Sequence, residues 1–293
     1  MFPPVPGLPF DPYRGVLYSP GALYEGLTSG GYGATPDARA YHWFRRTKAD
    51  GDTFASMLRA LHDDAVSDAL DEFLTGARVV GVMGGHATAR GSGAYAAAAR
   101  LGRTLARSGL TVATGGGPGA MEAANLGAYA APHPDPMLQE AGELLAAVPS
   151  FTPSVTDWAL AAFAVRERWP DGGGSVSIPT WFYGHEPPNA FADHIGKYFA
   201  NALREDGLLA RSTAGVIFLP GGPGPCGRSS TTPPRTPTNR MPPRPRWCWS
   251  GGPTGRTGCP PGPCCARRPR AGRWSPGSRW STRWRRRRWR RTG

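Results

Sequence analysis

The sequence contains no uninterrupted apolar run of about 18 residues, the length from which a membrane-spanning helix is recognised. Its N-terminus, MFPPVPGLPFDPYRG, has no basic segment followed by an apolar one, so it differs from a secretory signal peptide. We therefore expect a cytoplasmic protein with no membrane attachment. No group of His, Cys, Asp and Glu has the spacing of metal ligands, and neither a metal nor another cofactor is expected.

The last part of the chain lacks whole classes of side chain. Residues 225–293 contain no Lys, Asp, Glu, Leu, Ile, Val or Phe, yet they hold 18 Arg, six of the ten Trp and all five Cys. The cysteines have no clear zinc-site spacing, and a cytoplasmic chain is not expected to join them as disulfides. The net charge of +13 belongs to this tail, because residues 1–224 carry a net charge of −5. With almost no aliphatic side chains the tail is predicted not to pack.

Residues 1–224 alternate between strand and helix patterns. We predict an extended surface arm over 1–35 and a helical region over 37–74, followed by strands at 77–83, 110–114, 175–179 and 214–219. Helices are expected at 95–108, 120–130, 137–147, 155–168 and 190–209. In the region 37–74 the apolar stripe consists of Phe54, Met57, Leu58, Leu61, Ala65, Ala69, Leu70 and Phe73. The alternation predicts an α/β fold, a Rossmann-like doubly wound parallel sheet with helices on both faces, truncated at its C-terminal part.

Glycine-rich turns follow three of the predicted strands. Backbone N–H groups can approach an anion closely where no Cβ intervenes, and a helix N-terminus adds unpaired donors. We therefore predict that the three turns meet in one pocket that binds a phosphate or nucleotide; the alternative is that the glycines only tighten the turns. None of the turns is a Walker A or dinucleotide-binding motif. The predicted binding residues are Gly84, Gly85 and His86; Gly115, Gly116, Gly117, Gly119, Met121 and Glu122; and Gly221, Gly222 and Gly224.

Two of these turns resemble a known family. Residues 115–125, GGGPGAMEAAN, are similar to the "GGGxxGxM" motif of the Lonely Guy (LOG) family, whose members are often mislabelled lysine decarboxylases. Residues 220–224, PGGPG, resemble the first five positions of that family's "PGGxGTxxE" motif. The resemblance covers about residues 77–224. It implies a Rossmann-like fold, a homodimer when the chain is intact, and hydrolysis of nucleoside 5′-monophosphates to free base and ribose 5-phosphate.

The resemblance also implies roles for two residues. The Glu of "PGGxGTxxE" is the catalytic carboxylate of the family, and an Arg in the preceding helix assists it. Arg204 matches this Arg; the alternative is a solvated arginine at a helix end. Among the other candidates, His86 and His185 could contact base or phosphate, or only stabilise turns, and the aromatic loop 180–187 could stack on a base or simply pack.

The family's catalytic carboxylate is missing, because residues 225–228 read Pro-Cys-Gly-Arg where the family has Thr, two further residues and Glu. We interpret this absence as the result of the loss of one nucleotide at the Gly224 codon. In the restored frame, Trp and Cys codons become those of Val, Leu or Met, and residues 225–230 can read T-V-R-E-I-F, which contains the Glu. The alternative is a genuine Arg- and Trp-rich arm that binds nucleic acid, a partner that nothing else in the chain predicts.

These observations predict three parts of the chain. They are an N-terminal extension with a helix (1–75), a Rossmann-like nucleotide-binding domain (76–224), and the tail (225–293). The first functional hypothesis is a nucleoside-5′-monophosphate N-glycosidase that is impaired as written. The second is a non-catalytic nucleotide-binding or carrier protein on the same fold.

Overall fold

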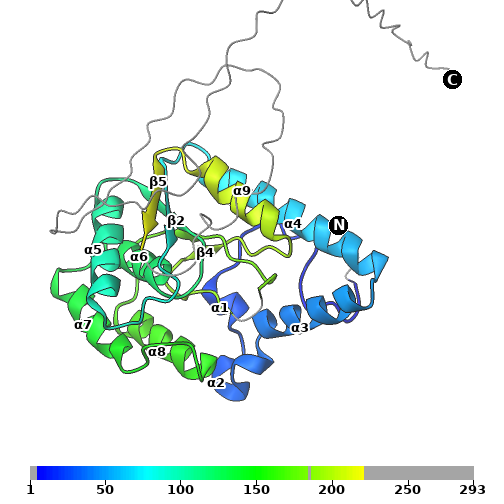
Figure 1. Ribbon diagram of the computed structural model, residues 1–293, viewed down its shortest axis with the longest axis horizontal. Helices are drawn as coiled ribbons and strands as arrows, with labels where there is room; N and C mark the ends of the chain where they lie inside the picture. The colour runs from blue at the N-terminus through cyan, green and yellow to red at the C-terminus, as the bar shows by residue number, and fades with distance from the viewer. Residues whose placement is uncertain (1–4, 184–185, 221–293) are drawn as a thin grey trace, which may run out of the picture. The chain divides into compact units, whose positions relative to one another are not determined.

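The computed structural model describes residues 5–183 and 186–220, and its centre is a five-stranded parallel sheet (Figure 1). The strand order is β4-β3-β2-β1-β5. The strands are β1 (Val79–Gly84), β2 (Thr111–Thr114), β3 (Val176–Ser177), β4 (His194–Ile195) and β5 (Gly215–Leu219). Strand β1 lies between β2 and β5; it pairs with β2 through Val80 and Val112, and with β5 through Val82 and Ile217. The predicted α/β fold with a parallel sheet is confirmed.

Helices cover both faces of the sheet, as predicted. Alternate residues of a strand point to opposite faces, so Val80 and Val82 pack with Ala124 of α6 (Ala120–Tyr129). Val79 and Met83 point the other way and join a core that contains buried residues of α4 (Thr53–Leu74) and α9 (Asn201–Arg211). Figure 1 shows α6 and α5 (Gly93–Arg107) on one side of the strands and α4 and α9 on the other.

Two further helices pack outside α5 and α6, and both lie close to their predicted positions. They are α7 (Pro136–Ala146) and α8 (Val155–Arg168). Within the ranges that the structure describes, every helix is too short or too polar to cross a membrane.

The N-terminal region differs from the predicted surface arm. It forms α1 (Pro20–Leu23), α2 (Leu27–Gly30) and a short 3-10 helix (Tyr32–Ala34), and Leu23, Tyr24 and Leu27 are buried in the main core. The helical region 37–74 is two helices, α3 (Pro36–Ala49) and α4. Gly51 separates them with a positive φ of 65°, and the Asp52 side chain caps α4 by accepting a hydrogen bond from the Ala55 amide.

The predicted apolar stripe of α4 is partly wrong. Phe54, Met57, Leu61 and Phe73 are exposed, whereas the buried face consists of Ala55, Leu58, His62, Asp63, Val66, Ala69, Leu70 and Leu74. The buried face includes His62 and Asp63 because their polar atoms have partners. Tyr18 Oη lies 2.8 Å from His62 Nε2, and Asp63 accepts hydrogen bonds from the amides of residues 199 and 200.

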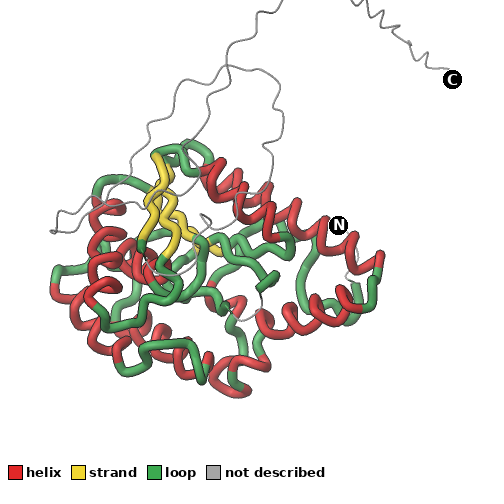
Figure 2. Tube along the Cα trace, viewed as in Figure 1, coloured by secondary structure: helices red, strands yellow, loops and turns green. Residues whose placement is uncertain are grey.

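The predicted helix over 190–209 is also wrong in its first half. Residues 194–195 form β4, and α9 begins only at Asn201 (Figure 2). The Asn189 side chain accepts hydrogen bonds from the amides of Phe191 and Ala192, which bends the chain before β4. Ile195 then donates its amide to the Tyr18 carbonyl at 2.8 Å. Tertiary pairing with β3 and the N-terminal segment therefore overrides the local helix pattern.

Candidate functional site

The first two glycine-rich turns meet at the carboxyl edge of the sheet. The amide of Ala120, the first residue of α6, donates to the Gly85 carbonyl at 2.9 Å. A Cβ added at Gly119 would lie 2.2 Å from the Gly85 oxygen and 2.6 Å from the His86 oxygen. Gly119 has a φ of 83°, so both its conformation and this close approach require glycine. The predicted meeting of these two turns is correct.

Two of the three successive glycines after β2, Gly115 and Gly116, contact different neighbours. Gly116 has a φ of 75° and packs against Pro179, which follows β3. A Cβ at Gly115 would lie 2.6 Å from Nη2 of Arg204 and 3.0 Å from Sδ of Met121. These close contacts account for both glycines by packing, which is the alternative that the sequence left open.

Arg204 is buried at this edge, with 9% of its surface exposed, so it is not a solvated helix-end arginine. Its Nε donates to the Ile178 carbonyl at 2.9 Å and its Nη2 to the Gly115 carbonyl at 3.2 Å. Burial lowers the pKa of Arg204, and Glu186 is the charge that opposes this most strongly. Arg204 therefore links the ends of β2 and β3 and places a cation beneath the triple-glycine turn.

Glu122 is fully buried in an ion pair with Arg90. The Arg90 Nε lies 3.2 Å from each carboxylate oxygen, and Nη2 makes a further short contact with Oε1. Arg90 also donates to the Trp158 carbonyl at 2.9 Å and lies over the Trp158 ring. Burial alone would lower the pKa of Arg90, but Glu122 raises it above its usual value. The Glu122 carboxylate therefore pairs with Arg90 and links α6 to the loop after β1.

A cavity of about 300 Å³ opens beside these residues. Of the predicted site residues, His86, Gly119 and Glu122 line it, whereas Gly115, Gly116, Gly117, Met121 and Arg204 do not. Its opposite wall is the segment 149–152, and the Phe151 ring lies 6.2 Å from the His86 ring. The cavity therefore combines the start of α6 with two aromatic residues, Phe151 and Trp158, and one imidazole.

Comparison with known families fits this geometry. Residues 77–132 match the model of the SLOG cluster4 family. This SLOG segment runs from β1 through the first glycine turn, α5, β2 and the triple-glycine turn to the end of α6. The match is consistent with a LOG-like Rossmann-type family and indicates a nucleotide-related function. No curated protein matches the chain.

Arg204 and the third predicted turn lie outside the SLOG segment. Gly221, Gly222, Gly224 and His185 fall outside the described residues, so the meeting of all three turns stays a prediction. The structure does place the end of β5 beside the first turn, because a Cβ at Gly84 would lie 2.4 Å from the Leu219 carbonyl oxygen. The residues that precede the third turn therefore reach the same edge.

Glu186 is a site residue that the sequence analysis did not single out. Its Oε1 lies 3.6 Å from Nδ1 of His86, and its Oε2 lies 3.5 Å from the position that a Cβ on Gly117 would take. Its position in the sequence could have identified it. Glu186 lies near the end of the aromatic loop that follows β3, and the carboxyl ends of parallel strands lie at one edge of the sheet. A carboxylate therefore lies beside the SLOG segment without belonging to it.

Polar side chains hold the segment after Glu186 in place. The Asn189 amide donates to the Gly116 carbonyl at 3.1 Å, and its side chain donates to Asn125 Oδ1 at the same distance. Thr114 also donates to Asn125 Oδ1, at 2.6 Å, and accepts from the Gly116 amide. This network joins α6, the triple-glycine turn and the segment 186–189 into one unit.

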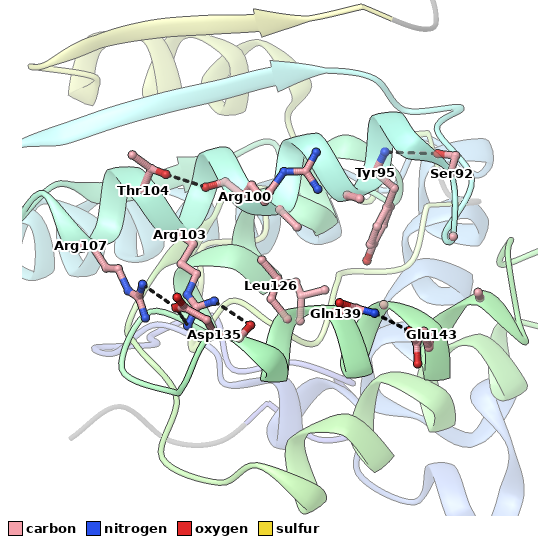
Figure 3. Close-up of a pocket in the computed structure, with 16 residues that line it drawn as sticks. Ser92, Tyr95, Arg100, Arg103, Thr104, Arg107, Leu126, Asp135, Gln139 and Glu143 are labelled. Atoms are coloured by element: carbon pink, nitrogen blue, oxygen red, sulfur yellow. Dashed lines mark hydrogen bonds and ion pairs between the residues drawn. The ribbon is translucent and has the colours of Figure 1, made fainter.

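A larger cavity of about 700 Å³ lies elsewhere, between α5 and α7 (Figure 3). None of the predicted site residues lines it. Figure 3 shows Arg103 and Arg107 turned toward Asp135, and their shortest distances to its carboxylate are 3.1 and 3.0 Å. Leu126 of α6 also lines the cavity, with Gln139 and Glu143 of α7 paired at one side. Among the described residues, no three His, Cys, Asp or Glu side chains could share a metal ion.

Proposed function

We propose that this chain binds a nucleoside 5′-monophosphate at the carboxyl edge of the sheet, and that its scaffold is that of an N-glycosidase. The observation that supports this most directly is the contact between the turn after β1 and the start of α6, beside a cavity of about 300 Å³. Ligand pockets begin at about this volume. The match to the SLOG cluster4 family adds independent support.

The proposed reaction cleaves the bond between base and ribose. Positive charge develops on the sugar as this bond breaks, so the site needs an anchored phosphate, a carboxylate near the ribose and a water molecule. The family's carboxylate is absent from the sequence at residues 225–228. General acid–base groups typically contribute about 10²–10⁴-fold to rate, and we therefore expect slow hydrolysis by the chain as written.

The frameshift is part of this proposal. No residue of β5 is buried, whereas the first five residues of its neighbour β1 are, and Phe218 is 55% exposed. A strand of composition GVIFL is typical of a sheet interior. Further strands encoded in the restored frame would cover it. Sequencing the DNA around the Gly224 codon tests this directly, and an unchanged reading frame in an independent isolate would contradict it.

The second candidate is a nucleotide-binding protein without catalysis. The missing carboxylate favours it, because residues 225–228 hold no Asp or Glu that could act beside the ribose. In both candidates the ligand is a nucleoside monophosphate or a related small phosphorylated molecule, and the protein is cytoplasmic and dimeric when intact.

Two measurements on two proteins separate the candidates. Binding of AMP, GMP, CMP and UMP is measured by calorimetry, and base release by chromatography, for the chain as written and for the frame-restored chain. If the protein is a hydrolase, both proteins should bind the nucleotides, and the restored chain should release base faster. The matched control is the restored chain with its recovered Glu changed to Gln, which should bind but not release base. Binding without release by either protein supports the second candidate, and absence of binding contradicts both.

A further inference from the structure

We propose that Glu186 binds the ribose 2′- and 3′-hydroxyls of the ligand, so that the site selects ribonucleotides over deoxyribonucleotides. This inference rests on the proposed function, because it assumes that a nucleoside monophosphate occupies the glycine-lined edge. It adds a sugar-binding role for a residue beyond the SLOG segment.

The position of Glu186 is the first argument. Its carboxylate lies where three parts of the site meet, close to Gly117 of the triple-glycine turn and to His86 of the first turn. Its side chain is 20% exposed and that of His86 is 32% exposed. Both groups are therefore accessible to a ligand while most of their surface is held by the protein.

Charge decides which part of the ligand faces Glu186. An ionised carboxylate only accepts hydrogen bonds, and it repels a phosphate. The phosphate therefore belongs at the start of α6, where the helix dipole favours an anion and the Glu122 charge is paired with Arg90. A hydrogen-bond donor that carries no negative charge must face Glu186. The two adjacent hydroxyls of a ribose offer two donors to the two carboxylate oxygens, a pairing that other nucleotide sites also use.

His86 connects the two parts of this arrangement. Its ring lines the cavity of about 300 Å³ and its Nδ1 faces Glu186. In the proposed arrangement the phosphate lies by Gly119 in this cavity, and the ribose lies beside His86 and Glu186, the latter just outside the cavity lining.

Restraint of the backbone beside Glu186 is the last argument. Beyond Glu186, the Tyr24 hydroxyl donates to the Pro188 carbonyl at 2.6 Å, and Asn189 is held by the Gly116 and Asn125 hydrogen bonds described above. Arg204 lies beneath as a buried cation that Glu186 influences. A segment whose backbone is already fixed on one side loses less freedom when a ligand binds.

The test compares AMP with 2′-deoxy-AMP by calorimetry on the full chain. We expect the unmodified protein to prefer AMP by about tenfold, the effect of one hydrogen bond to a charged group. Glu186→Gln and Glu186→Ala should reduce this preference to less than about threefold. Affinity for inorganic phosphate should stay the same or rise, since a negative charge is removed.

The matched control is Glu205→Gln. Glu205 is also a carboxylate near Arg204, at 3.9 Å, but it lies on α9 and its side chain is 40% exposed. This variant should keep the preference for AMP. A role for Glu186 that is only structural would change the melting temperature and leave the AMP preference intact.

Each outcome has a defined meaning. Equal binding of AMP and 2′-deoxy-AMP by the unmodified protein overturns the ribose inference and leaves the proposed nucleotide binding standing. A preference that survives in Glu186→Gln overturns it as well, even if Glu186→Ala does not fold. If neither nucleotide nor phosphate binds, the proposed function itself fails.

Discussion

Two cavities in the described part of this protein differ in size and in chemistry, and the smaller one lies beside the sequence motifs. The groove between α5 and α7 measures about 700 Å³, but two of its three arginines, Arg103 and Arg107, are paired with Asp135 and with backbone carbonyls. The cavity beside α6 measures about 300 Å³ and joins the glycine turns to His86 and Glu122. Volume alone would favour the larger groove, whereas convergent polar groups on a fixed backbone favour the smaller cavity as the proposed ligand site.

The largest expected contrast between the cavities lies in their ion pairs. Arg90→Ala should lower the free energy of unfolding by about 3–5 kcal/mol, because it leaves Glu122 as an unpaired buried charge. Arg107→Ala, at the larger groove, should cost about 1 kcal/mol or less, since the Arg107 side chain is 46% exposed. Urea unfolding measures both. Equal losses of unfolding free energy in the two variants would contradict the expected difference between the buried and the exposed ion pair.

A pair of glycine substitutions gives the next contrast. Gly119→Ala should destabilise the protein by about 1–3 kcal/mol or more, because alanine is strained at a φ of 83° and its Cβ would meet the Gly85 carbonyl. Gly142→Ala, in α7 at the larger groove, has no atom within 4 Å of the new Cβ and should stabilise by about 0.5–1 kcal/mol. Thermal melts distinguish the two, and a neutral Gly119→Ala would contradict the packing described here.

The smallest expected effect concerns ligand binding. Ala87→Trp places a large ring at the rim of the smaller cavity and should weaken AMP binding by at least about tenfold, a change of roughly 1.4 kcal/mol. Ala96→Trp makes the same change at the larger groove and should alter AMP affinity less than about twofold. Calorimetry measures both. Loss of binding in Ala96→Trp alone would move the proposed nucleotide site to the groove between α5 and α7.

The local sequence pattern was sufficient to predict elements whose structure depends mainly on their own residues. The strand at β1, the helix α8 and the glycine turn before α6 were predicted within a few residues, because apolar runs, helix periodicity and glycines act over short distances. The exposed stripe of Phe54, Met57 and Leu61 was predicted to be buried. Which face of α4 meets the core depends on partners such as Tyr18, which lies far away in the sequence.

The amino-acid sequence by itself determined the parallel α/β architecture, the glycine turns and the change of composition after Gly224. Only the tertiary structure decided that β4 forms where a helix was expected, that Glu122 is occupied by Arg90, and that Glu186 reaches Gly117 and His86. The physical reason is the range of the interactions. Turn and strand preferences arise between neighbouring residues, whereas a buried ion pair or a convergent site requires groups that the fold brings together from separate strands and loops.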